Sequence, residues 1–291
     1  MNRRLFLSTL GAAAAAPALH AERLPIRKGI LASMLPQDAG GQPLSFAERF
    51  AIAKACGFQS IEGQTTTDPK EAEEIRLAAE TTGLPVHSVM NMDHWRFPLS
   101  SDSPETVFKS LAGMRVSMRN AKLWGASTVL LVPGVVDAKT TYRQAWTRSQ
   151  ENIRKLLPLA EELKVIIALE EVWNKFLLSP LEFANYLDDF ASPWVKAYFD
   201  VGNVVLYGFP QDWIRTLGAR IVKLHIKDFA FPQRKVAEWR PLREGEIDWK
   251  EIHRALLDIR YRGDATVEVN GGDEAYLRLV SYRLDQILEG A

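Results

Sequence analysis

The sequence of 291 residues has a single cysteine, Cys56, and therefore can form neither an internal disulfide nor a zinc site made of cysteines. It also has no excess of charge of either sign, because 36 Lys and Arg residues balance 36 Asp and Glu residues. A chain without a basic surplus gives no electrostatic indication of binding to nucleic acid or to anionic membranes. We expect its partner to be a small molecule instead.

A glycine-rich phosphate-binding turn after an early strand is missing as well, and so is any linker or low-complexity segment that would divide the mature chain. The sequence does have 47% hydrophobic residues, enough for a full core, and the 25% charged residues of an ordinary globular protein. A chain of this length forms one large domain or two small ones.

Residues 1–24 have the order of an export signal, in which charged residues are followed by an apolar run and then by small residues. Arg3 and Arg4 stand before Leu-Phe-Leu, an arrangement that resembles the twin-arginine signal, although a chance pair of arginines is the alternative. The apolar run is too short to span a membrane in the mature protein. We therefore expect cleavage between Glu22 and Arg27, export to the periplasm, and a mature domain over 25–291 that is not attached to a membrane.

Short apolar segments alternate with segments of helical spacing along the mature chain, and a buried parallel strand has this apolar character. The predicted strands cover 28–34, 58–62, 85–90, 127–132, 165–169, 194–200, 221–226 and 265–269. Strands that alternate with helices form a parallel sheet, and eight such units close it into a single (β/α)8 barrel. A doubly wound open sheet is the alternative, but it would require the glycine-rich turn that the sequence lacks.

Four of the predicted strands lead into a side chain that can bind a metal. Glu170, Asp200, His225 and Glu268 lie at the carboxyl ends of strands five to eight, which are neighbours in a closed barrel. Three carboxylates and one imidazole suit Mn²⁺, Mg²⁺ or Zn²⁺, and the predominance of oxygen favours Mn²⁺. The sequence therefore predicts a divalent-metal site at this rim.

Each of these residues also has a simpler interpretation. Asp200 can cap the turn that follows it, and His225 can be a hydrogen-bonded core residue. Glu170 competes with Glu171 because neighbouring side chains on a strand point to opposite faces. We prefer Glu170, and we expect Glu268 to face the barrel interior because a carboxylate on the helix side would be buried without a partner.

Several motifs together resemble the xylose-isomerase-like barrel superfamily of sugar phosphate isomerases and epimerases, over essentially the whole mature chain. They are Ala168-Leu169-Glu170, Phe199-Asp200-Val201-Gly202-Asn203, Leu224-His225-Ile226-Lys227-Asp228, Gly245-Glu246-Ile247-Asp248-Trp249 and Val267-Glu268-Val269. The resemblance implies a metal-dependent sugar isomerase or epimerase in which Glu170, Asp200, His225 and Glu268 hold the metal. It further implies that Glu170 and Glu268 exchange the substrate proton and that the substrate passes through an enediolate.

Two positions depart from the epimerase pattern. Ketose 3-epimerases of this kind usually have a histidine three residues after the aspartate, where this chain has Asn203. An arginine expected soon after the strand-seven histidine is replaced by Phe229-Ala230-Phe231, ahead of Arg234. Because both positions contact substrate in the epimerases, and because the chain carries an export signal, we expect a free sugar, an oxidised sugar or a glycoside as the substrate.

Further substrate-binding candidates lie near the same rim. His94 and Trp95 belong to the polar loop after strand three, where a Trp ring can stack on a sugar. Lys227 follows His225 by two residues and so shares its face, and Asn203 follows Asp200. His87 on strand three either binds a substrate hydroxyl or is a core histidine. We expect Glu62, at the end of strand two, to support a metal ligand from behind.

Three other functions compete with the isomerase. A lyase or dehydratase on a keto-sugar or cyclitol would use the same metal and the same enediolate. A sugar-binding barrel without turnover would not need two opposed glutamates. An endonuclease would need more histidine ligands and a basic face, and the sequence has five histidines in all. The sequence leaves the oligomeric state open, a homo-oligomer included.

Overall fold

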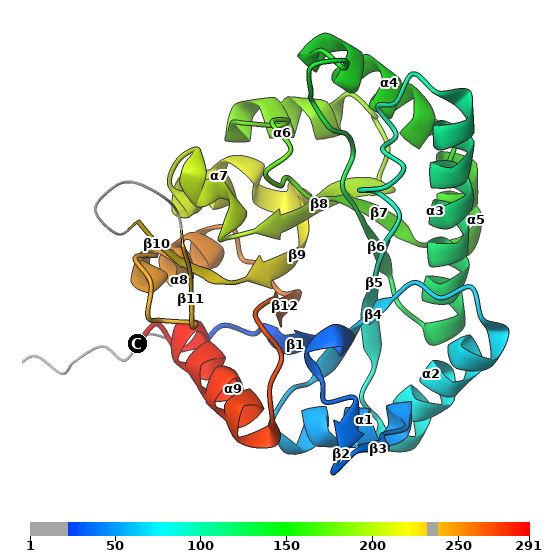
Figure 1. The fold of residues 1–291 in the computed structure, drawn as a ribbon. Helices are drawn as coiled ribbons and strands as arrows, with labels where there is room; N and C mark the ends of the chain where they lie inside the picture. Colours follow the sequence, from blue (N-terminus) through cyan, green and yellow to red (C-terminus); the bar gives the residue numbers. More distant parts are fainter. Residues whose placement is uncertain (1–22, 232–237) are drawn as a thin grey trace, which may run out of the picture.

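The computed structural model describes residues 23–231 and 238–291, so that nearly all of the predicted export signal lies outside it. Eight parallel strands close into a barrel in the order β1-β12-β9-β8-β7-β6-β5-β4, and helices surround it (Figure 1). The predicted (β/α)8 architecture is confirmed. No helix within the described ranges combines the length and the apolar character needed to cross a bilayer.

The barrel strands lie within a few residues of their predicted positions. Their bounds are β1 Arg27–Leu31, β4 Ser60–Gln64, β5 Val86–Met90, β6 Thr128–Leu131, β7 Ile166–Leu169, β8 Val195–Asp200, β9 Ile221–Ile226 and β12 Asp264–Val267. The register between β8 and β9 pairs Asp200 with His225, which brings two of the predicted metal ligands side by side. A small hairpin of β2 Asp38–Ala39 and β3 Gln42–Pro43 follows β1.

Helices connect the strands on the outside of the barrel, and local sequence signals mark their ends. They are α1 Phe46–Ala55, α2 Pro69–Thr82, α3 Pro104–Trp124, α4 Tyr142–Arg154, α5 Leu157–Leu163, α6 Pro180–Asp188, α7 Pro210–Leu217, α8 Trp249–Asp258 and α9 Glu274–Leu288. Ser45 and Glu48 form a capping box at the start of α1. Short 3₁₀ turns cover Ala32–Met34, Asn203–Leu206 and Gly218–Arg220.

One predicted helix is divided in two. The spacing predicts a single helix over 142–163, but the structure ends α4 at Arg154 and starts α5 at Leu157. Pro158 stands in the first turn of α5, where the absence of its N–H costs nothing. In an unbroken helix the same proline would remove a hydrogen bond and clash with the preceding turn, which explains the break.

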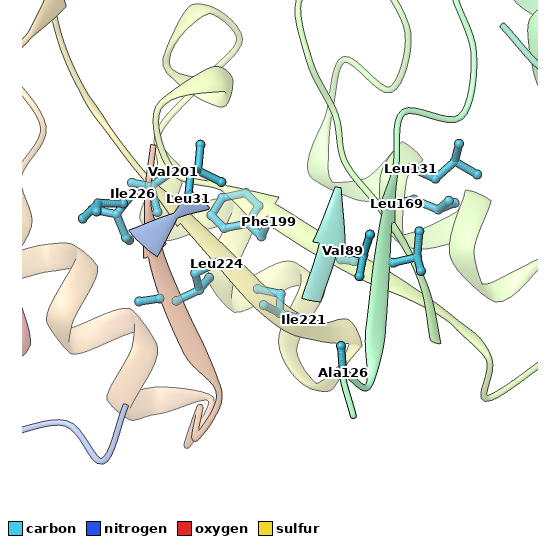
Figure 2. Close-up of a cluster of buried hydrophobic side chains, with 14 of the residues drawn as sticks. Leu31, Val89, Ala126, Leu131, Leu169, Phe199, Val201, Ile221, Leu224 and Ile226 are labelled. Atoms are coloured by element: carbon cyan, nitrogen blue, oxygen red, sulfur yellow. The ribbon is translucent and has the colours of Figure 1, made fainter. Parts of the chain in front are cut away.

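The main hydrophobic core lies between the barrel and its helices. Figure 2 shows part of it, with Leu224 and Ile226 from β9, Phe199 from β8 and Leu169 from β7. All four side chains are buried. Because side chains alternate along a strand, packing these residues outward turns Asp200, His225 and Glu170 toward the barrel axis.

A second hairpin occupies the stretch after β9, which the sequence analysis left without any element. β10 Asp228–Ala230 pairs antiparallel with β11 Glu238–Arg240. Asp228 holds the returning chain, because its Oδ2 accepts hydrogen bonds from Arg243 N at 2.7 Å and from Trp249 Nε1 at 3.1 Å. The strands are three residues long, too short to produce a visible alternation, so the sequence pattern did not reveal them.

Candidate functional site

The four predicted metal ligands converge at the carboxyl end of the barrel. Glu170 directly follows β7, Asp200 ends β8, His225 lies near the end of β9, and Glu268 directly follows β12. One ligand atom from each lies within 4.8 Å of those of the other three. The arrangement predicted from the strand ends is therefore present in the fold.

Glu170 and Glu171 point in different directions, as strand alternation requires. The Oε1 atom of Glu170 lies 2.8 Å from Nδ1 of His225, so this carboxylate belongs to the cluster. Glu171 is fully buried, and neither of its carboxyl oxygens has a hydrogen-bond partner among the described residues. Burial raises the pKa of Glu171 well above its usual value, with Asp200 adding to the shift. Glu171 therefore lies outside the cluster of candidate ligands.

Asp200 caps the following turn, as one interpretation of the sequence predicts, and it also belongs to the cluster of candidate ligands. Its Oδ1 atom caps the following turn by accepting hydrogen bonds from the backbone of Gly202 at 2.8 Å and of Asn203 at 2.9 Å. Its Oδ2 atom points to the cluster and lies 2.6 Å from Nζ of Lys227. The turn therefore fixes the carboxylate while leaving one oxygen for the site.

His225 has its two ring nitrogens in different environments. Nδ1 faces the cluster, 2.8 Å from Glu170 Oε1 and 3.2 Å from Glu268 Oε2. Nε2 faces the buried Glu62, whose Oε2 atom is 2.9 Å away. Because an ionised carboxylate can only accept, Glu62 favours a proton on Nε2, and Nδ1 is then the nitrogen that can bind a metal.

Glu62 is held in turn by a tyrosine inside the barrel. The hydroxyl of Tyr198, on β8, donates to Glu62 Oε2 at 2.5 Å. Both side chains are fully buried. The expected supporting role of Glu62 agrees with this contact, whereas the sequence analysis missed Tyr198, because an inward tyrosine within an apolar strand gives no signal of its partner.

Lys227 completes the polar cluster. Its ammonium lies 2.6 Å from Asp200 Oδ2 and 2.6 Å from Glu268 Oε2. The side chain reaches this position by passing over Gly202, where any Cβ would clash with Cγ of Lys227. Gly202 in the Asp-Val-Gly-Asn motif is therefore required by the close approach of the lysine, a need that no sequence pattern reveals.

The charges of the cluster shift one another strongly. Burial raises the pKa of Glu170 to about 7, with Glu268 adding to the shift and His225 opposing it. Burial works against a charged His225, but Glu62 and the cluster carboxylates outweigh it and raise the pKa of His225 well above the usual value. Burial likewise opposes a charged Lys227, yet Asp200 and Glu268 raise its pKa. The site as a whole is negative and attracts positive charge.

The donor set fits a divalent metal. Asp200 Oδ2 and Glu268 Oε2 are buried and, although close to the lysine ammonium, accept no well-aligned hydrogen bond within the described chain. Together with Glu170 and Nδ1 of His225 they offer three oxygens and one nitrogen. Oxygen ligands with one imidazole suit Mg²⁺ and Mn²⁺, and they also bind Zn²⁺.

His87 does not lie with the metal ligands. Its Nε2 atom is 2.8 Å from Thr266 Oγ1, and its Nδ1 atom is 3.8 Å from Asp264 Oδ2, near the amino end of the barrel. Burial, reinforced by Lys223, lowers the pKa of His87 well below its usual value. This position favours the core interpretation over contact with a substrate hydroxyl.

The other predicted substrate contacts differ in their exposure. His94 is buried, and burial lowers its pKa to about 4 despite the opposing charge of Glu268. Trp95 packs edge-on against His94 at 5.6 Å and is 55% exposed, which leaves its ring open to solvent. The Asn203 amide donates to the backbone oxygen of Glu171 at 3.0 Å, so this side chain is committed to the turn. Arg234 lies outside the described residues.

An aromatic group at the rim was missed by the sequence analysis. Trp173, in the loop after β7, stacks on Trp239 of β11 with 5.5 Å between the ring centres. Phe229 of β10 packs against both rings. The signal was available as two tryptophans in polar loops after strand ends, but only the hairpin pairing brings them together.

Comparison with known sequences identifies relatives of this chain. A sequence model described as Xylose isomerase-like TIM barrel matches residues 50–284. L-ribulose-5-phosphate 3-epimerase UlaE of Escherichia coli O1:K1 / APEC is 26% identical over 235 residues, which cover 76% of this chain and 81% of that protein.

Solved structures with the same fold are more distant in sequence. The 3-keto-D-glucoside 4-epimerase YcjR of E. coli superimposes with a TM-score of 0.73 at 14% identity, over 90% of this chain and 98% of that chain. A xylose isomerase-like TIM barrel protein of Mycobacterium smegmatis, in complex with magnesium, superimposes with a TM-score of 0.68 at 19% identity, over 91% of this chain and 97% of that chain. At these identities the likeness shows the fold alone.

Proposed function

Because the chain belongs to the xylose isomerase-like TIM barrel family, we propose that it is a divalent-metal-dependent sugar isomerase or epimerase. The observation that carries the proposal is the convergence of Glu170 and Glu268 on one cluster from non-adjacent strand ends. The epimerase relative described above supports the reaction class.

The two glutamates have the placement that proton exchange requires. β7 and β12 are separated in the barrel order by β8 and β9, so the carboxylates approach the barrel axis from different sides. One carboxylate removes the proton on the carbon beside the carbonyl, and the other returns a proton from the opposite side. A bound divalent ion would supply Lewis-acid stabilisation of the negative charge that develops on the substrate oxygens.

The remaining cluster residues would orient the ligand side chains and neutralise part of their negative charge. Lys227 holds Asp200 and Glu268 by its two 2.6 Å contacts and brings a positive charge next to the reacting region. Glu62 keeps the proton of His225 on Nε2. Both actions preserve the geometry of the ligand atoms, and preorganised charge of this kind is a large part of enzymatic stabilisation.

The donor set indicates which metal ions the site prefers. Three carboxylates and one imidazole favour Mn²⁺, with Mg²⁺ or Zn²⁺ as alternatives. Elemental analysis of purified protein after mild dialysis is expected to find about one tightly held divalent ion per chain. Absence of the ion, together with no rebinding of Mn²⁺ in calorimetry, would remove the basis of the proposal.

Solvent exchange tests the reaction itself. We expect the purified protein with Mn²⁺ to incorporate deuterium from deuterated water into a keto-sugar at the carbon beside the carbonyl. Loss of water from the product would instead establish the dehydratase alternative, which uses the same enediolate. Binding of the sugar without exchange or product would establish the sugar-binding alternative.

We also propose that the protein is exported to the periplasm, on the evidence of the sequence order of residues 1–24. Replacing Arg3 and Arg4 by lysine should leave the precursor in the cytoplasm if the twin-arginine pathway carries it. The test is fractionation of cells that express either form. Unchanged export of the double variant would point to the general secretory pathway.

A further inference from the structure

A cavity of about 350 Å³ opens directly beside the candidate metal ligand Glu268. Lys227 and Glu268 form its inner end, so it is continuous with the cluster. The rest of its wall is formed by Trp239 and Arg240 of β11, by Pro241, Val269 and Asn270 of the adjoining loops, and by Tyr276 of α9. Cavities of a few hundred Å³ hold small organic ligands, so there is room here for more than the reacting carbon atoms.

Trp239 gives this cavity a rigid aromatic wall. Its ring is fixed by stacking on Trp173 and by Phe229, whose ring centre is 3.8 Å away, yet it remains 53% exposed. The hairpin that carries it is pinned through Asp228, which accepts hydrogen bonds from Arg243 N and Trp249 Nε1. Lys227 Nζ also lies over this ring, 4.9 Å from its centre. The exposed remainder of Trp239, together with Pro241 and Val269 of the lining, forms an apolar surface of fixed orientation that a ligand can cover at little entropic cost.

The charges around the cavity are nearly balanced and do not favour an anion. Lys227 is already engaged by two carboxylates, at 2.6 Å each. Arg240 donates to Glu238 at 2.8 Å, so its charge is also matched. A phosphate dianion would have no unmatched cation among these lining residues, and it would lie near the negative Glu268. Asn270 and Tyr276 add uncharged polar side chains to the wall, and Pro241 and Val269 add apolar ones.

We propose that this cavity is a subsite for a neutral second sugar ring, so that the substrate is a keto-disaccharide or a keto-glycoside rather than a phosphorylated ketose. A pyranose presents both an apolar C–H face, which matches the apolar surface of Trp239, Pro241 and Val269, and hydroxyl groups, which match Asn270 and Arg240. The inference rests on the proposed function, because the reacting keto-sugar is taken to lie at the metal cluster between Glu170 and Glu268.

Three ketoses with one common core test the subsite. Fructose has a free hydroxyl at C6, fructose 6-phosphate has a dianion there, and isomaltulose has a neutral glucose ring there. Calorimetry on the Mn²⁺-loaded protein is expected to show isomaltulose binding about tenfold more tightly than fructose, the scale of one aromatic contact with its hydrogen bonds. Fructose 6-phosphate should bind no more tightly than fructose. Equal affinity for fructose and isomaltulose, or a preference for the phosphate, would overturn the proposal.

A pair of variants assigns the effect to the cavity wall. Trp239→Ala should weaken isomaltulose binding about tenfold and fructose binding much less, whereas Trp239→Phe should restore most of the difference. Phe108→Ala is the matched control, because Phe108 is an exposed aromatic residue, 69% exposed, on α3 and outside the cavity lining. An equal loss for both sugars in Trp239→Ala would show a general disturbance of the site and would contradict the subsite.

A failure of the subsite and a failure of the proposed reaction can be told apart by measuring binding and proton exchange separately. Deuterium exchange at the carbon beside the carbonyl is measured for the same three ketoses. If isomaltulose binds more tightly but none of the three exchanges deuterium, the subsite stands and the isomerase function falls. If fructose and isomaltulose exchange with equal kcat/KM and bind equally, the function stands and the subsite falls.

Discussion

The two ends of the barrel interior both hold buried charged side chains, and they differ in how those charges are matched. At the amino end a single carboxylate, Asp264, is surrounded by cations and a hydroxyl. At the carboxyl end Glu170, Asp200, Glu268 and the underlying Glu62 share Lys227 and the imidazole of His225. The negative charge at the amino end is balanced by nearby cations, whereas the carboxyl end has more carboxylates than cations.

The amino-end cluster satisfies its carboxylate fully. Asp264 Oδ2 lies 2.6 Å from Nζ of Lys223 and 2.9 Å from a guanidinium nitrogen of Arg27, and Oδ1 accepts from Ser60 at 2.9 Å. Burial would raise the pKa of Asp264, but His87, Lys223 and Arg27 lower it to about 2. At neutral pH the two permanent cations carry this effect, because burial keeps His87 neutral. Such a closed cluster has a structural role.

The carboxyl-end cluster cannot be closed in the same way. Asp200 Oδ2 and Glu268 Oε2 contact the same ammonium without well-aligned hydrogen bonds. An unmatched buried negative charge is costly, and a divalent cation relieves that cost. The comparison teaches that buried charge alone does not mark a functional site in this barrel. Buried carboxylates that lack enough cations and hydrogen-bond donors within the protein do mark one.

The largest expected effect is a loss of turnover from substitutions in the carboxyl-end cluster. Glu170→Gln or Glu268→Gln keeps the shape and one oxygen ligand but removes the basic carboxylate. Either change should lower kcat by about a hundredfold or more, the scale of general acid–base loss. Metal should be at least partly retained. Steady-state kinetics and elemental analysis of the same preparations measure the two effects.

Glu171→Gln is the matched control for both substitutions. Glu171 is buried next to Glu170 but lies outside the cluster, and its burial raises its pKa and so favours the neutral form that an amide resembles. We expect a much smaller loss of turnover. A critical Glu171 beside a silent Glu170 would mean that the wrong face of the strand end has been assigned.

A substitution in the amino-end cluster should lower the stability of the protein and leave its turnover unchanged. Asp264→Asn removes the charge that matches the buried Lys223, and breaking a buried pair costs about 3–5 kcal/mol. Urea unfolding should show this loss, while kcat of the folded enzyme stays near that of the wild type. Asp188→Asn is the control, because its ion pair with Arg220 is solvent-exposed and should contribute less than about 1 kcal/mol. A large loss of kcat would refute the division between the two ends.

The same residue predicts an acid dependence. The folded-state pKa of Asp264 lies below its unfolded value of 3.8, so its contribution to stability is present above pH 4 and is lost as the pH falls toward 2. A shift of about two units corresponds to roughly 2–3 kcal/mol. Unfolding measured between pH 4 and pH 2 should therefore be steeper for the wild type than for Asp264→Asn, and parallel curves would contradict the assignment.

The smallest expected effect concerns the support of His225. Glu62→Gln keeps an acceptor for the Nε2 proton but removes the charge behind the imidazole, and loss of such a partner lowers metal affinity about 10- to 100-fold. Titration of the apoprotein with Mn²⁺ in a calorimeter measures it directly. Glu171→Gln again serves as control, with little change expected. Unaltered Mn²⁺ affinity in Glu62→Gln would reduce Glu62 to a packing role.

The positions of the candidate ligands in the carboxyl-end cluster follow from the sequence, because strand periodicity is a local property. An apolar run that ends in a carboxylate identifies Glu170, and the same logic identifies Asp200 and Glu268. Barrel closure then requires these strand ends to meet. The interpretation of His225 as a ligand depended on that closure rather than on its own surroundings.

Other features depended on contacts between distant segments. The carboxylate of Asp264 begins its strand, which sets it apart from the candidate ligand Glu268 at the other end, but nothing local shows which cations surround it. His87 and Lys223 meet Asp264 only through barrel closure. The same is true of Tyr198, which reaches Glu62 across the barrel axis.

Local periodicity thus sufficed for the barrel and for the ring of ligand positions, since both depend on which face of each strand is apolar. Tertiary structure alone decided how the charges at the two barrel ends are matched, because the ion pairs there join residues far apart in the chain. It also decided the cavity beside Glu268, whose wall depends on the β10–β11 pairing and on the Asp228 contacts that hold it. Charge matching is a property of distances across the barrel, and no pattern along one strand contains those distances.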